Sequence, residues 1–188
     1  MSCRPHRPTP FTDRLRHRAI LLHTTSEIRG KVQTPLWTTK EAFTEYLKRR
    51  YDMHVCLDDT YDMDLGLRQR LANDMSLLHL DWRTLGGQGD QYLSTARRLY
   101  RPQRVAHYYA FVLAHLVGGG TQVAASARPY LPPWFFTESQ YFNDLPSPLP
   151  VYDAINDEAM YWTTDDEDLC LRELAVAFRV GRRMISMF

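Results

Sequence analysis

Two side chains near the start of the chain could bind a metal and an anion. Arg16 and His23 are seven residues apart. In a helix, seven residues make almost two turns, so both side chains point the same way, about 10 Å apart along the axis. An imidazole and a cation at that separation could hold the metal of a porphyrin and one carboxylate at its edge. The alternative for His23 is a hydrogen-bonded histidine within the core.

A second candidate set lies in the middle of the chain, at residues 105–128. An apolar run that carries Tyr109 and His115 leads into a glycine triplet at residues 118–120. Each interior glycine costs a helix about 1 kcal/mol relative to alanine. A backbone without side chains lets a flat ligand approach closely, and the helix can bend over it. The alternative is a loop between two helices.

Composition and charge limit the class of protein. The chain has 188 residues, enough for one domain with a sizeable core. Its net charge of +1 gives no electrostatic footprint for nucleic acid. Cys3, Cys56 and Cys170 form no CxxC pair and are odd in number. We therefore expect a reducing compartment, with neither disulfides nor structural zinc.

Segments for targeting or membrane insertion are not predicted. The apolar run at residues 105–117 is too short to span a bilayer, and residues 1–10 lack the apolar core of a secretory signal. We expect an intracellular protein, either cytoplasmic or in a plastid or mitochondrion, without a membrane span. Residues 1–11 are predicted to form a flexible arm and residues 12–188 a helical domain.

Helices must position the candidate residues, because apolar side chains recur at helical spacing and no strand alternation is present. Leu15, Ala19 and Leu22 share one face of a first helix, capped at Thr12-Asp13. Capping-box patterns at residues 38–41 and 164–167 open two more helices. The predicted helices cover residues 12–29, 38–61, 65–80, 91–100, 105–128, 151–162 and 164–187. The fold class is therefore all-α, in a single domain of seven or eight helices.

Two charged clusters each have a functional and a plain interpretation. Asp58, Asp59 and Asp62 could bind a metal, but no His or Glu lies at ligand spacing, so a solvated face is favoured. A basic cluster follows at Arg97, Arg98, Arg101 and Arg104. It could dock an acidic redox partner, although a solvated surface is the safer interpretation.

Several short segments share their order and spacing with one known family. Leu15-Arg16 through Leu22-His23-Thr24 and, later, His107-Tyr108-Tyr109, Ala114-His115 and Gly118-Gly119 carry the likeness. Further matches are Trp37-Thr38, Tyr46-Leu47, Asp59-Thr60, Leu80-Asp81-Trp82, Tyr92-Leu93, Trp162-Thr163, Cys170-Leu171 and Phe178. In these residues the chain resembles the heme oxygenases, and those of plants and algae more than those of animals. The matches are short, but they are collinear over about residues 12–185.

The resemblance implies an all-α heme oxygenase-like fold in which heme b lies between the first helix and a glycine-kinked distal helix. His23 would be the axial iron ligand, and Arg16 and Tyr109 would contact the propionates, with Phe178 also against heme. Gly118 and Gly119 would let the distal backbone close over the oxygen-binding face. Water held near His115 would supply protons. His115, Gly118 and Gly119 would thus form the catalytic face.

The activity implied by the resemblance is cleavage of heme to biliverdin, carbon monoxide and ferrous iron. Heme is then both substrate and cofactor, and electrons come from an NADPH-linked reductase or a ferredoxin. The chain departs from the family between Arg128 and Arg172, where it has no Lys or Arg. In the family, the helix matched by residues 151–160 offers basic side chains to the propionates, but here those turns hold Tyr152, Asp153, Asn156 and Asp157.

Two alternatives to an active heme oxygenase follow from that departure and from the open interpretation of His23. One is a non-catalytic relative on the same scaffold that binds heme or another tetrapyrrole, which the acidic stretch favours. The other is an unrelated helical enzyme or interaction protein, in which His23 is a core residue.

Overall fold

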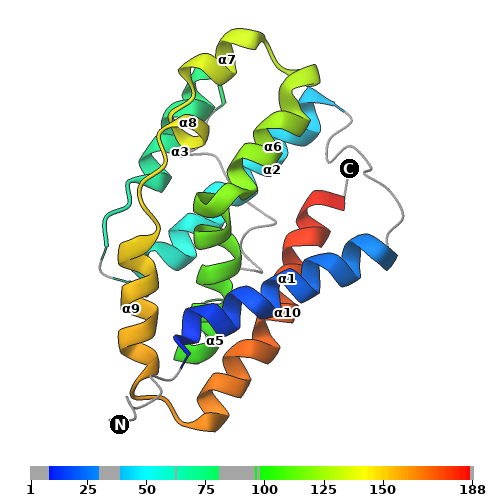
Figure 1. Cartoon of the computed structure of the whole chain (residues 1–188). Coiled ribbons are helices and arrows are strands. Elements are labelled where there is room, and N and C mark those ends of the chain that lie inside the picture. Colours follow the sequence, from blue (N-terminus) through cyan, green and yellow to red (C-terminus); the bar gives the residue numbers. More distant parts are fainter. Residues whose placement is uncertain (1–8, 30–38, 62, 81–95, 97, 187–188) are drawn as a thin grey trace, which may run out of the picture.

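The computed structural model describes residues 9–29, 39–61, 63–80, 96 and 98–186, and over these ranges the chain is helical without strands (Figure 1). The helices are α1 (Phe11–Arg29), α2 (Lys40–Leu57), α3 (Leu67–Leu77), α5 (Arg101–Tyr108), α6 (Gly120–Ala127), α7 (Pro133–Glu138), α8 (Gln140–Asn143), α9 (Leu149–Ala159) and α10 (Thr164–Ser186). The 3-10 segments are η1 (Asp58–Thr60) and η5 (Arg128–Tyr130), and the π-helical segments are η3 (Tyr109–Leu113) and η4 (His115–Gly119). The all-α prediction is confirmed.

One long helical path forms the centre of the fold. It runs from α5 through η3 and η4 into α6, as the green ribbon of Figure 1. α10 packs along α5 and η3, while α1 packs against α10 and α9, and α2 packs against α3. Val105, Leu113 and Leu174 are completely buried where these helices meet. The central path therefore has neighbours on several sides, which explains its unbroken apolar sequence.

The observed helix ends differ from the predicted caps by about one residue. α1 begins at Phe11, before the predicted cap, and the Thr12 amide instead donates to Asn156 Oδ1 at 3.0 Å. At α10 the capping hydroxyl belongs to Thr163, which accepts from the Asp166 amide at 3.2 Å. The Asp166 carboxylate accepts in return from the Thr163 amide at 3.0 Å. The sequence therefore predicted the correct turn for the start of α1 and of α10, but the wrong capping residue in each.

One bond joins the two charged clusters, and other members of each bind residues outside them. Arg104 donates to Asp59, and Arg101 forms an ion pair with Glu158, with 2.8 Å between Nε and Oε1. Asp58 lies 3.0 Å from His54 Nδ1. Asp59 and Arg101 are exposed, as a solvated face predicts, whereas Asp58 and Arg104 are partly buried. Their bonds also join η1 to α2, α5 and α9. Among the described residues, no group of three His, Cys, Asp or Glu side chains is placed to hold a metal.

Several predictions lie wholly or mostly outside the described residues. These are the flexible arm, most of the predicted helix 91–100, Asp62 and Arg97. Of the cysteines, Cys56 and Cys170 are described, and both are buried free thiols. One helix, Arg101–Tyr130, is long and apolar enough to cross a membrane by length and composition alone. Half of its most apolar window is buried inside the protein, and a core helix has the same length and composition.

Candidate functional site

The central helix bends at the glycine triplet. Val117 has φ −97° and ψ 20°, and Gly118 has φ +123° and ψ −16°, both outside the helical region. A φ of +123° is unfavourable for side chains with a Cβ, so the bend requires glycine at this position. Helix continues on both sides, through η4 before the bend and α6 after it. The predicted glycine-kinked helix is confirmed, and the alternative of a loop is excluded.

The three glycines have different surroundings. A Cβ on Gly118 would meet nothing within 4 Å, whereas a Cβ on Gly119 would lie 2.7 Å from the Ala114 carbonyl oxygen. A Cβ on Gly120 would lie 2.6 Å from Cε1 of the His115 ring. Only Gly118 therefore presents bare backbone to open space. Val117 beside it is 52% exposed, so the outer side of the kink is apolar and open.

His115 points to the other side of the kink, into the core. Its Nε2 lies 3.0 Å from the Tyr141 carbonyl oxygen, and the two rings stack with centroids 4.1 Å apart. Because a carbonyl only accepts, Nε2 carries the proton and Nδ1 is the acceptor. Burial lowers the pKa of His115 well below its ordinary value, and the Arg50 charge lowers it further. His115 is thus a neutral imidazole that can accept a hydrogen bond through Nδ1.

A cation and two phenols from different helices gather at the other end of η3. Tyr109 is 5% exposed, Tyr152 of α9 is half-buried, and Arg16 of α1 is exposed. Burial raises the pKa of both phenols, whereas the Arg16 charge lowers it and the Asp13 charge raises it. The charge of Arg16 therefore acts on both phenols, and the contact of Arg16 and Tyr109 with propionates stays a prediction. The part played by Tyr152 and Asp13 was missed, because neither side chain has the spacing of a motif.

The two remaining predicted residues lie on α1 and α10. His23 is in the fourth turn of α1, but its side chain is outside the described part of the structure, so its role as a ligand stays a prediction. On the described part of α1, Leu15 and Ala19 are buried whereas Ile20 is 53% exposed. Phe178 of α10 is half-buried and packs against the core.

A buried polar network behind the kink was not predicted. Nη2 of Arg50 donates to the Phe111 carbonyl at 2.5 Å and to the Tyr141 hydroxyl at 2.9 Å. The same hydroxyl lies 2.9 Å from His54 Nε2, and His54 Nδ1 lies 3.0 Å from Asp58 Oδ1. Arg50 follows two basic residues and so resembles a solvated surface. The available signal was its place four residues after Tyr46 on the apolar stripe of α2.

Asp74 of α3 fixes the backbone of the segment that carries Tyr141. Its buried carboxylate accepts from the Gln140 amide at 2.8 Å, from the Tyr141 amide at 3.1 Å and from the Ser139 hydroxyl. These groups open α8, which is only four residues long. Burial raises the pKa of Asp74, and the three hydrogen bonds oppose that rise. Tyr141 is therefore held through both its backbone and its side chain.

Comparisons with known proteins give likeness in structure without likeness in sequence. No family model and no curated protein matches the chain. The solved structures that match include heme oxygenase-1 from the cyanobacterium Synechocystis sp. PCC6803 in complex with heme, with a TM-score of 0.69 and 19% identity over 94% of this chain and 91% of that one. Heme oxygenase-2 from Synechocystis sp. PCC 6803, in complex with heme and NO, matches with the same TM-score and 18% identity over 94% and 84% of the two chains.

The protein has a heme oxygenase-like fold. The residues of α9 that stand where the family has basic side chains differ in their exposure and bonding. Asp153 and Asp157 are exposed, and Asn156 is bonded to the α1 backbone. The carboxylate that lies near Arg16, Tyr109 and Tyr152 is instead Asp13 of α1. The repulsion of a propionate by the acidic residues of α9 stays a prediction.

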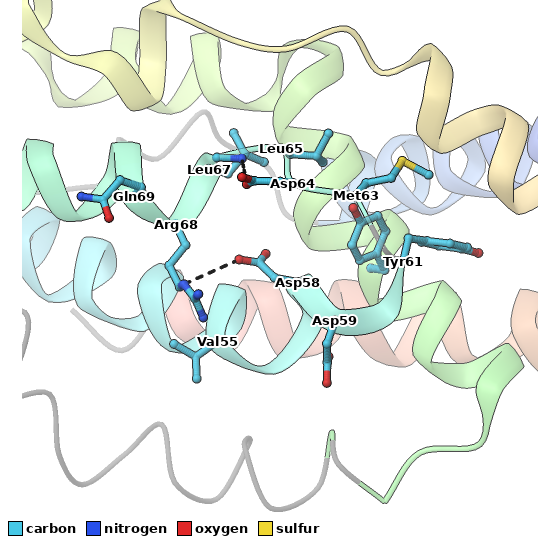
Figure 2. A pocket seen from close by; sticks show the side chains of 12 residues that line it. Val55, Asp58, Asp59, Tyr61, Met63, Asp64, Leu65, Leu67, Arg68 and Gln69 are labelled. Atoms are coloured by element: carbon cyan, nitrogen blue, oxygen red, sulfur yellow. Dashed lines mark hydrogen bonds and ion pairs between the residues drawn. The ribbon is translucent and has the colours of Figure 1, made fainter.

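A cavity in the described part of the structure lies elsewhere. It measures about 890 Å³ and is formed by the end of α2, η1 and the start of α3 (Figure 2). Asp58, Asp59, Asp64 and Arg68 line it, and an ion pair of 4.0 Å joins Arg68 Nε to Asp58 Oδ2. No predicted site residue lines this cavity. Its volume therefore says nothing about the site at the kink.

Proposed function

We propose that the chain binds heme b between α1 and the kink and cleaves it to biliverdin, carbon monoxide and ferrous iron. The observation that carries the proposal is Gly118, which turns bare backbone toward open space at a bend that tolerates no other residue without strain. The fold, shared with heme oxygenases solved with heme, supports the same ligand.

The described residues fit the shape and charge of heme. Ile20 of α1 and Val117 at the kink are exposed apolar side chains. Arg16 offers a cation, and Tyr109 and Tyr152 offer hydroxyls, to the propionates. Tyr109 begins the first π-helical segment and Gly118 lies near the end of the second, so the two residues lie near opposite ends of this stretch.

In this proposal each residue has a limited task. Bound heme supplies the iron at which dioxygen reacts and the ring that is cleaved. His23 holds the iron from α1, and Arg16 with the two tyrosines fixes the rotation of the ring. The backbone at Gly118 restricts the space on the other face, and Gly119 lets the helix close behind it against the Ala114 carbonyl. His115 lies on the inner side of the kink, so in this proposal it is a neutral imidazole that supports the kink from behind and does not contact the ligand.

The remaining parts of the proposal concern partners and place. Cleavage needs electrons, for which we propose an NADPH-linked reductase or a ferredoxin. We propose an intracellular location, cytoplasmic or organellar, consistent with the free thiols of Cys56 and Cys170.

A second candidate function is binding of heme or a related tetrapyrrole without cleavage. Asp13 favours it, because a carboxylate beside Arg16 weakens the attraction for a propionate. A ligand held in a shifted orientation would then present the wrong edge to the kink.

Titration with hemin tests the proposal. We expect the wild-type chain to give a sharp, shifted Soret band, which His23→Ala abolishes. His17→Ala is the matched control, because His17 is an exposed histidine on the same helix. A band that is unchanged in His23→Ala would exclude this ligand. Adding ascorbate or a reductase then separates the candidates, since absorption by biliverdin supports cleavage and a persistent Soret band supports binding alone.

A further inference from the structure

The buried network has one internally consistent direction. Arg50 has only donors, so the Tyr141 oxygen accepts from its Nη2 at 2.9 Å and from its Nε at 3.2 Å. The single hydroxyl proton of Tyr141 is then directed to His54 Nε2. His54 Nδ1 carries the ring proton and donates to Asp58. The order Arg50, Tyr141, His54, Asp58 therefore fixes the position of each proton in this hydrogen-bonded network.

This hydrogen-bonded network is unsuited to carrying protons to the kink. Its inner end is a guanidinium, which does not release a proton in proteins. Its outer end, Asp58, lines the solvent-open cavity of Figure 2. A proton that entered at Asp58 would have no acceptor beyond Tyr141 along this chain. We therefore assign the network a role in holding the π-helical segments in position.

Tyr141 connects to both π-helical segments. Through its hydroxyl it holds Arg50, whose Nη2 donates to the Phe111 carbonyl in η3. Through its own carbonyl and ring it holds His115 in η4. A π-helical turn is rare and less stable than an α-helical one, and it commonly occurs at functional sites. Two such turns in succession need bonds from outside the helix.

We propose that Tyr141 is a positioning residue for the glycine kink: by holding Phe111 through Arg50 and His115 directly, it sets the angle at which Gly118 faces the ligand. The proposal rests on the proposed function for its effect on heme. The clamp, by which we mean the bonds from Tyr141 to Arg50 and to His115, is a property of the protein without heme. Since the hydroxyl is buried, its removal leaves Arg50 and His54 each without a partner that they have in the wild type.

The test compares Tyr141→Phe with Tyr108→Phe. The first substitution keeps the ring on His115 and the backbone carbonyl, and removes only the hydroxyl. Tyr108 is an equally buried tyrosine of the same helical path whose hydroxyl makes no hydrogen bond among the described residues. Hydrogen exchange is measured on the protein without heme, with α10 as the internal reference. Hemin affinity, cleavage rate and the ratio of biliverdin isomers are then measured on the loaded protein.

We expect Tyr141→Phe to raise exchange about tenfold at residues 109–116 and to leave α10 unchanged, because the opening is local. Hemin affinity should stay within about twofold, while the cleavage rate falls about tenfold and the isomer ratio broadens. Tyr108→Phe should change none of these. Equal behaviour of the two variants in exchange, rate and isomer ratio would overturn the clamp.

Two further outcomes remain distinguishable. If the wild type neither binds nor cleaves heme, the proposed function fails, and the exchange measurement still decides the clamp. If Tyr141→Phe does not fold, Asp58→Ala replaces it, since Asp58 lies at the half-exposed end of the network. We then expect a smaller rise in exchange, again confined to residues 109–116, and no rise would contradict the proposal.

Discussion

At the scale of single residues, the glycine triplet combines three separate requirements. Gly118 is needed for its positive φ, Gly119 for its approach to the Ala114 carbonyl, and Gly120 for contact with the His115 ring. Only the first of these concerns the outer, open side of the kink. Substitutions at Gly119 and Gly120 therefore report on the helix, and a substitution at Gly118 reports on the proposed ligand site.

Gly118→Leu should abolish heme binding by placing a side chain in the open space. The positive φ adds a backbone cost of about 1–2 kcal/mol. Gly66→Leu is the matched control, because Gly66 has φ +62° at the start of α3 and lies away from the kink. We expect both variants to lower the melting temperature, and only Gly118→Leu to lose the hemin Soret band. Normal hemin binding by Gly118→Leu would remove the observation on which the proposed function depends.

At the scale of elements, α8 shows how side chains stabilise a helix that cannot form alone. Four residues are fewer than an isolated helix needs in water. The Asp74 carboxylate accepts from the first groups of α8, at the end of the helix where amides lack partners within it. α8 in turn presents Tyr141 to the kink. The position of Tyr141 therefore depends on α3 as well as on α2.

Asp74→Asn should lower the free energy of unfolding by about 1–3 kcal/mol, because the new amide group cannot accept from all three donors. Urea unfolding followed by circular dichroism measures the change. Asp153→Asn is the control, since Asp153 is exposed on α9 and should alter stability by less than about 0.5 kcal/mol. Equal stability of the two variants would show that the carboxylate is not required for α8.

The elements could be predicted from sequence where one local pattern determines them. The apolar stripe of α1 and the glycine triplet gave a helix and a bend, and both are present. The π-helical turns could not be predicted, since an i to i+5 bond has no sequence signature of its own. Arg50 and Tyr141 are 91 residues apart, so neither residue's local sequence reveals the other. Arg16 and Tyr109 were paired through the resemblance, whereas Asp13 needed the packing of α1 against α9.

At the scale of the whole molecule, the fold keeps three histidines uncharged in its core. His54, His107 and His115 are each at most 4% exposed, and burial lowers the pKa of all three. Asp58 opposes this shift at His54 and Glu173 opposes it at His107, whereas His115 has a backbone carbonyl as its partner. His115 should therefore bind protons least readily of the three. Their neutral state links the stability of the whole protein to pH.

We expect the free energy of unfolding to fall as the pH is lowered from about 6.5, the ordinary pKa of a histidine. Above that value the imidazoles are neutral in both states and contribute nothing to the slope. Below it the unfolded chain binds protons that the folded chain does not bind. Each such proton lowers the free energy of unfolding by up to about 1.4 kcal/mol per pH unit. Ordinary carboxylates stay mostly ionised down to pH of about 5.5. Asp74, whose pKa burial raises, is the exception, so the contribution of a histidine is assigned by comparing variants in which Asp74 is unchanged.

The comparison of His115→Gln with His17→Gln assigns that slope. His115→Gln lowers stability at every pH by disturbing the core, but the slope between pH of about 6.5 and 5.5 should become shallower by up to about 1.4 kcal/mol per pH unit, because one buried imidazole no longer refuses a proton. His17 is exposed on α1, so His17→Gln should leave the slope as in the wild type. Parallel slopes for all three proteins would mean that His115 titrates alike in the folded and unfolded chain. That result would also contradict the neutral role given to it at the kink.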